Sequence, residues 1–243
     1  MKRSDGRAPD ALRAVRLVPD FTENPLGSVL CQMGRTMVLC TVHHEPGVPA
    51  FLRGSGRGWV TAEYSMLPGS TDRRSEREAA RGRLSGRTQE IQRLIGRSLR
   101  AVTDLDSLGE RTLFVDCDVL QADGGTRTAS ITGAWLALAL GLRRMVRGGT
   151  FERVPLLDAV AAVSVGVVGG RALLDLAYEE DAAAEVDLNV VATGSGRFVE
   201  VQGTAERGTF GREDLAAMTS LALGGIAELV RLQEKVLAEA EPR

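Results

Sequence analysis

The segment 121–133 carries the residue types that bind a phosphate group. It contains Gly124, Gly125 and Arg127, and it joins two apolar segments typical of a strand and a helix, 112–120 and 134–146. Glycines let the backbone approach a ligand closely, and the free N–H groups at a helix start attract an anion. A guanidinium adds a fork that matches phosphate oxygens. The segment predicts an anion site, with the hydroxyl side chains as further donors: Thr126, Thr128 and Ser130.

The same segment has a plainer interpretation, in which the two glycines form a tight turn and Thr126 is a helix N-cap. It is not a Walker A loop, because no Gly-Lys-Ser/Thr ends it, and it lacks the Gly-x-Gly-x-x-Gly of dinucleotide sites. A phosphate bound here need not belong to a nucleoside triphosphate.

An arginine-rich block precedes this loop. Between Arg73 and Arg100 there are nine arginines and three glutamates, a local charge of +6 that attracts phosphate. Apolar residues at helical spacing in 91–99 predict a helix, with Arg87 at its start and placed to meet a bound phosphate. The arginines ahead of the helix lie in a predicted loop from which they can reach RNA: Arg73, Arg74 and Arg77. A merely solvated charged surface is the alternative.

An acidic block lies further along the chain. The segment 175–187 holds six carboxylates and no basic residue. Like charges repel unless a cation sits among them. With Asp187 at the start of a strand and Asp181 at the mouth of the preceding loop, the two carboxylates can converge on Mg²⁺, which prefers oxygen ligands. A solvated acidic loop is the alternative.

A phosphate site and a Mg²⁺ site are complementary parts of a phosphoryl-transfer centre. A covalent nucleophile with its base is not indicated, since the only histidines are the neighbours His43 and His44. The attacking group must then be brought in, and inorganic phosphate fits the glycine loop.

Composition indicates a soluble, cytoplasmic protein with no membrane partner. The 243 residues are 44% hydrophobic with a net charge of −2, enough for a substantial core. The three cysteines show no Cys-x-x-Cys spacing, which argues against a disulfide framework or zinc site. The longest uncharged apolar run, 159–170, is too short for a membrane helix and is typical of a buried strand.

The order of elements predicts an α+β fold of two similar halves. The expected first half, 10–147, holds the arginine block and the phosphate loop, and the expected second half, 155–240, holds the acidic segment and a C-terminal helix. Predicted strands are 15–18, 27–33, 36–42, 59–66, 112–120, 156–168, 172–178, 186–192 and 198–202. A final helix at 213–239 leaves open a break at Gly224 and Gly225.

Several blocks in order resemble the ribonuclease PH family, bacterial phosphorolytic exoribonucleases that trim tRNA 3′ ends. The blocks are Arg3–Arg7, Gly58–Tyr64, Gly86–Arg97, Asp116–Thr128, Tyr178–Asp181, Asp187–Val190 and Val201–Glu206. The resemblance implies a ribosomal-protein-S5-like α+β fold, two pseudo-repeated βα halves, in a homohexameric ring built as a trimer of dimers. The chain departs from the family at Gly69, where an arginine is frequent. That departure bears on one RNA contact.

The resemblance also implies roles for individual residues. Inorganic phosphate, the co-substrate, would be bound by Arg87, Gly125, Thr126 and Arg127. Asp181 and Asp187 would be the catalytic and Mg²⁺-linked positions, and Arg73, Arg74 and Arg77 would bind RNA. The expected reaction is attack by phosphate on the last phosphodiester of a tRNA precursor, releasing a nucleoside 5′-diphosphate, with nucleotide addition in reverse.

Two other functions compete with this one. The first is a catalytically silent RNA-binding ring subunit of an exosome-like assembly, which retention of the phosphate and acidic residues disfavours. The second is a small-molecule kinase, which the absence of a triphosphate-binding loop disfavours.

Overall fold

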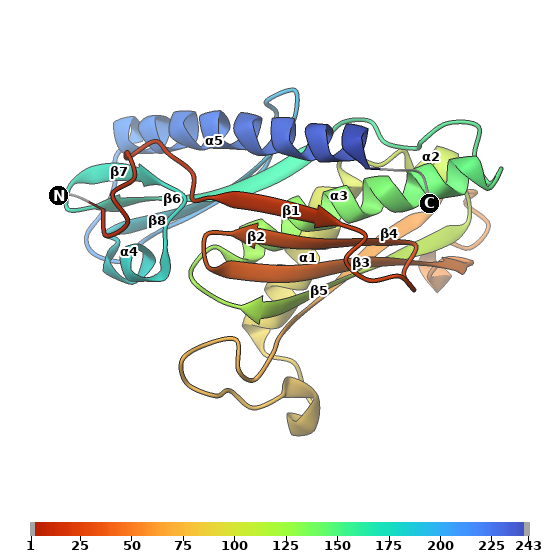
Figure 1. Ribbon diagram of the computed structural model, residues 1–243, viewed down its shortest axis with the longest axis horizontal. Helices are drawn as coiled ribbons and strands as arrows, with labels where there is room; N and C mark the ends of the chain where they lie inside the picture. The colour runs from red at the N-terminus through yellow and green to blue at the C-terminus, as the bar shows by residue number, and fades with distance from the viewer. Residues whose placement is uncertain (1–2, 241–243) are drawn as a thin grey trace.

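Two β-sheets sandwich one long helix in the computed structural model, which describes residues 3–240 (Figure 1). The first sheet has the order β1-β2-β3-β5-β4. Its strands are β1 Val15–Pro19, β2 Gly27–Met33, β3 Thr36–Pro46, β4 Trp59–Met66 and β5 Arg111–Gln121. The predicted meander is confirmed, since β1, β2 and β3 pair in sequence as antiparallel neighbours.

The pairing of β5 brings the end of that strand to the centre of the molecule. It lies antiparallel to β3 and parallel to β4. The parallel pair requires a crossover, which α1 Gly86–Arg100 supplies after a loop and the short helix η2 Glu78–Arg81. The apolar face of α1 is buried, as its spacing predicts. The remaining short helices of this half are η1 Ala50–Leu52 and α2 Leu105–Leu108.

The second sheet is antiparallel and has the order β7-β6-β8-β9. Its elements are β6 Val160–Val168, β7 Arg171–Leu174, α4 Tyr178–Ala183, β8 Val186–Thr193 and β9 Phe198–Ala205. The hairpin predicted around Gly169 and Gly170 is confirmed. Within the run 159–170, Val160–Val168 form strand β6, which is mostly buried because it packs against both α3 and α5.

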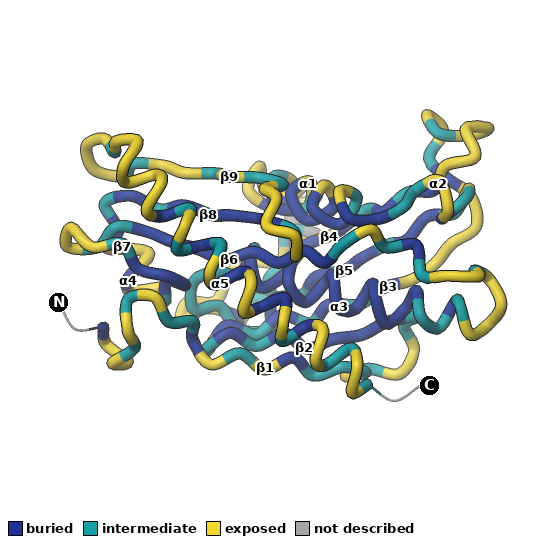
Figure 2. The backbone as a smooth tube through the Cα atoms, turned by 90° about the horizontal axis from the view of Figure 1, so that it is seen from above, coloured by how far each residue is buried: buried dark blue, intermediate teal, exposed yellow. Residues whose placement is uncertain are grey.

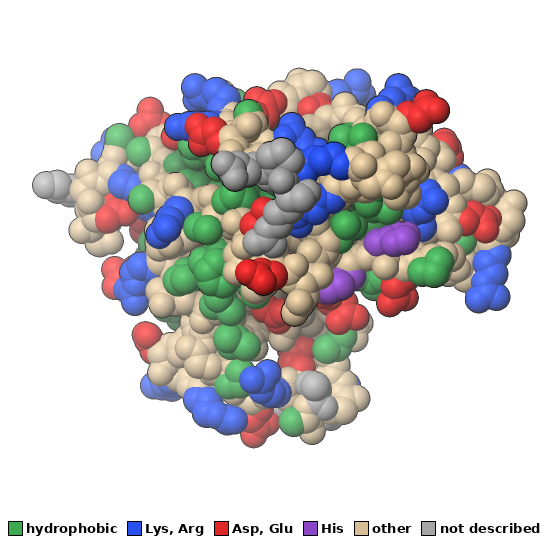
Figure 3. Space-filling model, turned by 45° about the vertical axis from the view of Figure 1, so that its right-hand side comes forward, with side chains coloured by type: hydrophobic (Ala, Val, Ile, Leu, Met, Phe, Trp, Pro, Cys, Tyr) green, Lys and Arg blue, Asp and Glu red, His purple; other side chains and the backbone are tan. Residues whose placement is uncertain are grey.

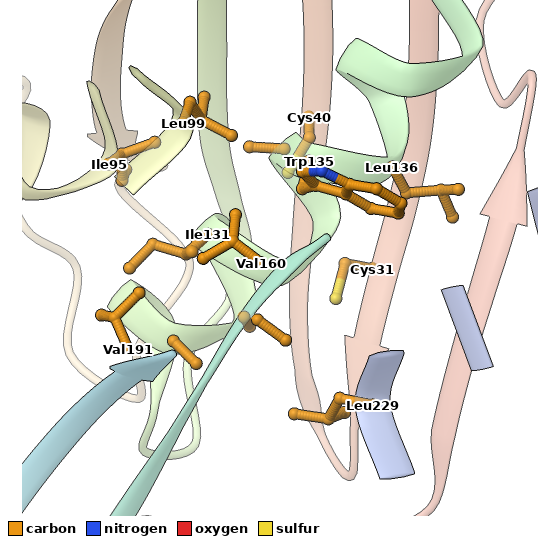
Figure 4. Close-up of a cluster of buried hydrophobic side chains, with 14 of the residues drawn as sticks. Cys31, Cys40, Ile95, Leu99, Ile131, Trp135, Leu136, Val160, Val191 and Leu229 are labelled. Atoms are coloured by element: carbon orange, nitrogen blue, oxygen red, sulfur yellow. The ribbon is translucent and has the colours of Figure 1, made fainter. Parts of the chain in front are cut away.

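Helix α3, Thr126–Arg147, is the element that both sheets share. It is buried on almost every side, and Figure 2 shows it dark blue between the strands of the two sheets. Gly133 makes this packing possible, because a Cβ there would lie 2.7 Å from Cys31 Cβ and 2.8 Å from Cys40 Sγ. Figure 4 shows Ile131 and Trp135 between side chains of both halves. The three cysteines pack as small buried hydrophobes, as expected.

Helix α5, Arg212–Glu239, covers the second sheet without a break at Gly224 and Gly225. A Cβ on Gly225 would lie only 2.9 Å from the Leu174 side chain, so glycine allows the helix to pack closely here. By length and composition alone, α5 would suffice to cross a membrane. Its buried side chains belong to the protein core: Met218, Ala222, Ile226, Leu229 and Val230.

The α+β class is confirmed by this arrangement. The two halves share one continuous hydrophobic core through α3. The division at 10–147 and 155–240 therefore stays a prediction about the two halves.

Candidate active site

The glycine loop has the geometry of a helix N-terminus open to an anion. Gly124 and Gly125 take φ angles of 73° and 64°, in the region that favours glycine, and α3 begins at the next residue. Gly125 is the N-cap, and no side chain caps the helix. The first N–H groups of α3 therefore lack an acceptor within the helix and point to the site.

The hydroxyl side chains after the glycines have other partners. Ser130 Oγ donates to the Thr126 carbonyl at 2.8 Å, and Thr128 Oγ1 donates to the Gly125 carbonyl at 2.9 Å. Both residues are buried. Because α3 begins at Thr126, these hydroxyls bond back to the preceding turn. The prediction that Thr128 and Ser130 are phosphate donors is wrong.

Thr126 and Arg127, the first two residues of α3, contact side chains from other elements. The Thr126 hydroxyl lies 2.9 Å from the Tyr64 hydroxyl, which comes from β4. Arg127 Nη1 donates to Gln202 Oε1 on β9 at 2.5 Å and lies 3.5 Å from Glu90 Oε1 on α1. Its guanidinium is thus held by both halves of the protein while its side chain stays 13% exposed.

Arg87 is the second residue of α1, as predicted, and its side chain is exposed. The helix is capped by Ser85, whose Oγ accepts from the Thr88 N–H at 3.1 Å. Arg87 and Arg127 both act on the Tyr64 hydroxyl, where burial raises the pKa and the two guanidinium groups lower it. Two arginines from separate helices thus converge beside the start of α3.

Asp181 stands on a short helix and not at a loop mouth. It belongs to α4, and the chain turns at Ala184 and enters β8, where Asp187 is the second residue. The loop placement of Asp181 is therefore wrong, while the strand placement of Asp187 is confirmed. A helix forms here because Glu180 accepts from the Ala177 N–H at 3.0 Å and satisfies its first turn.

The two carboxylates are close enough to perturb one another. Partial burial and the negative charges of Asp181 and Glu206 raise the pKa of Asp187. Partial burial also raises the pKa of Asp181, against the opposing effect of Arg87, Arg127 and Arg13. The arginines named for phosphate therefore lie within electrostatic reach of the acidic pair.

One carboxylate oxygen of Asp187 has no hydrogen-bond partner, which fits a bound cation. Its Oδ1 is buried and has no hydrogen-bond partner, which is costly for a carboxylate unless a positive ligand meets it. Across residues 3–240, no three His, Cys, Asp or Glu side chains form a metal cluster. Two carboxylates with open positions suit Mg²⁺, which retains waters and takes substrate phosphate oxygens.

The arginines ahead of α1 lie on a projecting loop, 67–77. Arg73, Arg74 and Arg77 are exposed there, and Figure 3 shows basic side chains on the lower projection. A cavity of about 1160 Å³ lies next to this loop, and its lining includes Arg73, Asp123 and Tyr178. Arg87, Arg127, Asp181 and Asp187 are not among its described lining residues, so it lies beside the predicted centre.

Sequence reasoning missed four residues of the site. Tyr64 and Gln202 position the front of α3, and Glu206 adds negative charge beside both aspartates. All three lie within the blocks that resemble the family, which was the available signal. Arg13 lies outside those blocks, and only its contacts reveal it.

Comparisons with known proteins agree over nearly the full length. The models of the 3′ exoribonuclease family match as domain 1 at residues 11–141 and domain 2 at 158–225. Ribonuclease PH of Bacillus subtilis is 56% identical over 241 residues, covering 99% of this chain and 98% of the relative. Ribonuclease PH of Syntrophomonas wolfei is 55% identical over 237 residues, with coverages of 98% and 99%.

Solved structures show the same fold at low identity. Rice Rrp46 superposes with a TM-score of 0.78 at 19% identity, covering 97% of this chain and 100% of that one. A chain of the Archaeoglobus fulgidus exosome with RNA bound to the active site gives 0.80 at 24% identity, with coverages of 96% and 92%. The predicted fold of two βα halves is confirmed.

The two matched domains, on this fold, define a two-domain 3′ exoribonuclease. Such an enzyme removes nucleotides from the 3′ end of RNA. The chain belongs to the ribonuclease PH family, whose enzymes are phosphorolytic and use inorganic phosphate as co-substrate.

Proposed function

We propose that this chain trims tRNA precursors from the 3′ end by phosphorolysis, with a nucleophile site and an acidic site facing each other across the halves. The observation that carries the proposal is that Arg87 and Arg127 lie within electrostatic reach of Asp181, because their charges oppose the rise that burial causes in the pKa of Asp181. Phosphate and the scissile linkage would come together between these two arginines and Asp181.

The phosphate site consists of two guanidinium groups and one helix start: Arg87, Gly125, Thr126 and Arg127. The free N–H groups at the start of α3 point at the anion, and the Gly125 conformation keeps that end clear of a side chain. Contacts with Gln202 and Glu90 hold Arg127 before phosphate arrives. A pre-positioned guanidinium loses little freedom on binding, which favours catalysis by orientation.

Asp181 and Asp187 form the catalytic acidic pair and hold Mg²⁺. When bound, the metal supplies positive charge at the reacting phosphate. The raised pKa of Asp181 keeps its carboxyl protonated to a higher pH than a free aspartate, which supports a role in giving the proton to the leaving oxygen. Metal binding and proton transfer are the two tasks that this pair shares.

The reaction exchanges one phosphate linkage for another. A phosphate oxygen attacks the phosphorus of the last phosphodiester, and the bond from that phosphorus to the preceding 3′ oxygen breaks. The terminal residue leaves as a nucleoside 5′-diphosphate, and the shortened RNA keeps a 3′-hydroxyl once its oxygen gains a proton. Because the bonds are of similar kind, nucleotides are added when phosphate is scarce.

RNA is bound ahead of α1 by Arg73, Arg74 and Arg77. Their exposure on a projecting loop supports contacts to a phosphate backbone. Gly69 lies in the same loop and supplies no guanidinium. We further propose a homohexamer, a trimer of dimers, acting in the cytoplasm without a membrane partner.

The silent ring subunit is the weaker alternative. The likeness to exosome chains lies at 23% to 24% identity and shows the fold alone. The residues that a phosphorolytic centre needs are retained: Arg87, Gly125, Thr126, Arg127, Asp181 and Asp187.

A product assay tests the proposal. The protein is incubated with a 3′-tailed tRNA precursor and Mg²⁺, with or without inorganic phosphate. Nucleoside 5′-diphosphates that form only with phosphate support phosphorolysis. Nucleoside monophosphates formed regardless of phosphate would contradict it, and RNA binding without turnover would favour the silent subunit.

A further inference from the structure

A buried ion pair joins the N-terminal segment to the acidic half. Arg13 donates through Nε and Nη2 to the two oxygens of Asp175, at 3.0 and 2.7 Å, and its backbone N–H donates to the same carboxylate at 2.8 Å. The Asp175 side chain is 0% exposed and that of Arg13 is 4% exposed. The pair is bidentate and almost dry, so its geometry is narrowly defined.

The same guanidinium also holds the phosphate loop. Arg13 Nη1 donates to the Asp123 carbonyl at 2.5 Å, and Nη2 lies 3.5 Å from the Gly124 carbonyl. A Cβ on Gly125 would lie 3.0 Å from Nη2. Arg13 thus contacts the residues immediately before the start of α3.

Asp175 fixes the chain just before α4. Its φ of 53° is unusual for a non-glycine residue, and its N–H donates to the Ser164 carbonyl at 2.7 Å. The next N–H, of Leu176, donates to Ser164 Oγ at 3.0 Å. A Cβ on Gly124 would lie 2.6 Å from the Leu176 carbonyl oxygen, so loop and acidic segment pack backbone to backbone. Five residues separate Asp175 from Asp181.

A second buried pair anchors α4 itself. Arg3 donates through Nε and Nη2 to the Glu180 carboxylate at 2.7 and 2.8 Å, and Nη2 also donates to the Asp175 carbonyl at 3.1 Å. Glu180 is the neighbour of Asp181 on α4. The N-terminal segment therefore contacts the phosphate loop and the acidic segment at once.

We infer that Arg13 and Asp175 are positioning residues that set the spacing between the phosphate loop and Asp181. The inference rests on the proposed function, since it presumes that these two parts hold nucleophile and acid. A buried ion pair is poor support for stability alone, because an apolar pair of similar volume often stabilises as well. Fixed geometry is the better reason for it, since a displacement of about 1 Å can lower the rate about 100-fold.

The test compares Arg13→Lys and Asp175→Asn with a matched control. Lysine keeps the charge but cannot bridge Asp175 and two carbonyls at once. The control is Arg144→Lys, which weakens the Arg144 to Asp20 ion pair at the far end of α3. Asp20 is the other non-glycine residue with positive φ, at 55°, among residues 3–240. Both pairs therefore stabilise a similar backbone feature.

The readouts are KM for phosphate, kcat, KM for RNA and the melting temperature. We expect both site variants to raise KM for phosphate about tenfold or more and to lower kcat, with KM for RNA within about twofold of wild type. Arg144→Lys lowers the melting temperature alone. Unchanged KM for phosphate in Arg13→Lys, or an equal rise in Arg144→Lys, would overturn the inference.

Two further arms keep the outcomes separate. If Asp175→Asn does not fold, Ser164→Ala is used in its place, because this variant removes only the hydroxyl that accepts from the Leu176 N–H. An unchanged KM for phosphate in Ser164→Ala would count against the inference. Wild-type turnover that needs no phosphate would instead contradict the proposed function. Phosphate-dependent wild type with unaffected site variants would contradict only the positioning role.

Discussion

Two groups of arginines in this chain carry the same guanidinium group but differ in their exposure to solvent. Arg73, Arg74 and Arg77 project from an exposed loop, whereas Arg13 and Arg127 are held by partners on two or more elements. Exposed charges are screened by salt and act over a distance on a flexible partner. Enclosed guanidinium groups act through fixed geometry. The comparison teaches that arginine count alone does not separate RNA binding from chemistry.

The largest effect is expected at Asp187, which belongs to the acidic pair proposed to face the enclosed arginines. Asp187→Asn should lower kcat by about 100-fold or more, because the side chain keeps its shape but loses the charge that we propose binds Mg²⁺. Turnover of tailed tRNA with phosphate measures it, and size in solution serves as the control. Normal activity in this variant would contradict the catalytic role, and a variant that no longer assembles as wild type does would point to a structural role.

Arg87→Ala should abolish most phosphorolysis while RNA affinity stays within about twofold. The guanidinium is assigned to the nucleophile, so its loss removes transition-state interactions and not strand contacts. Arg93→Ala, from an exposed position on the same helix, is the control. An equal loss of RNA binding and turnover in Arg87→Ala would instead assign Arg87 to RNA binding, together with Arg73, Arg74 and Arg77.

Replacing Arg73, Arg74 and Arg77 together by alanine should weaken RNA binding uniformly. With about 0.7 counterions released per contact on single strands, the slope of log affinity against log salt should shrink by about 2. Phosphate KM should stay unchanged. The control replaces three exposed arginines elsewhere and removes equal charge: Arg16, Arg53 and Arg171. An identical slope change in that control would show that the effect comes from total charge and not from RNA contacts of the loop.

The smallest effect concerns stability against pH. The folded-state pKa of Asp187 is raised by burial and by Asp181 and Glu206, so folding favours the protonated carboxyl. Its stabilising contribution is present below the unfolded pKa, about 4, and is lost as pH rises through the folded value. Without Mg²⁺, Asp187→Asn should therefore melt slightly higher than wild type at neutral pH, by about 1 to 3 °C, and the gain should fade near pH 4. Thermal melts in a chelating buffer check this, and a gain independent of pH would exclude the charge as its cause.

Local pattern was enough for most elements of the fold. The meander, the helix at Gly86–Arg100 and the hairpin at Gly169 all depend on side-chain period and turn residues, which neighbours in sequence decide. Asp181 was misplaced because α4 is only 6 residues long and depends on Arg3, 177 positions away in the sequence, to hold Glu180. Ser130 was misread because its position inside α3 depends on where the helix begins.

By itself, the sequence determined which residue types are present, their local periods and the ordered blocks that mark the family. Tertiary structure alone decided that Arg13 contacts both the phosphate loop and Asp175, and that Arg127 is held by Gln202. The physical reason is distance along the chain. These partners are separated by 75 to 162 residues, and only packing of both sheets on α3 brings them within hydrogen-bonding range.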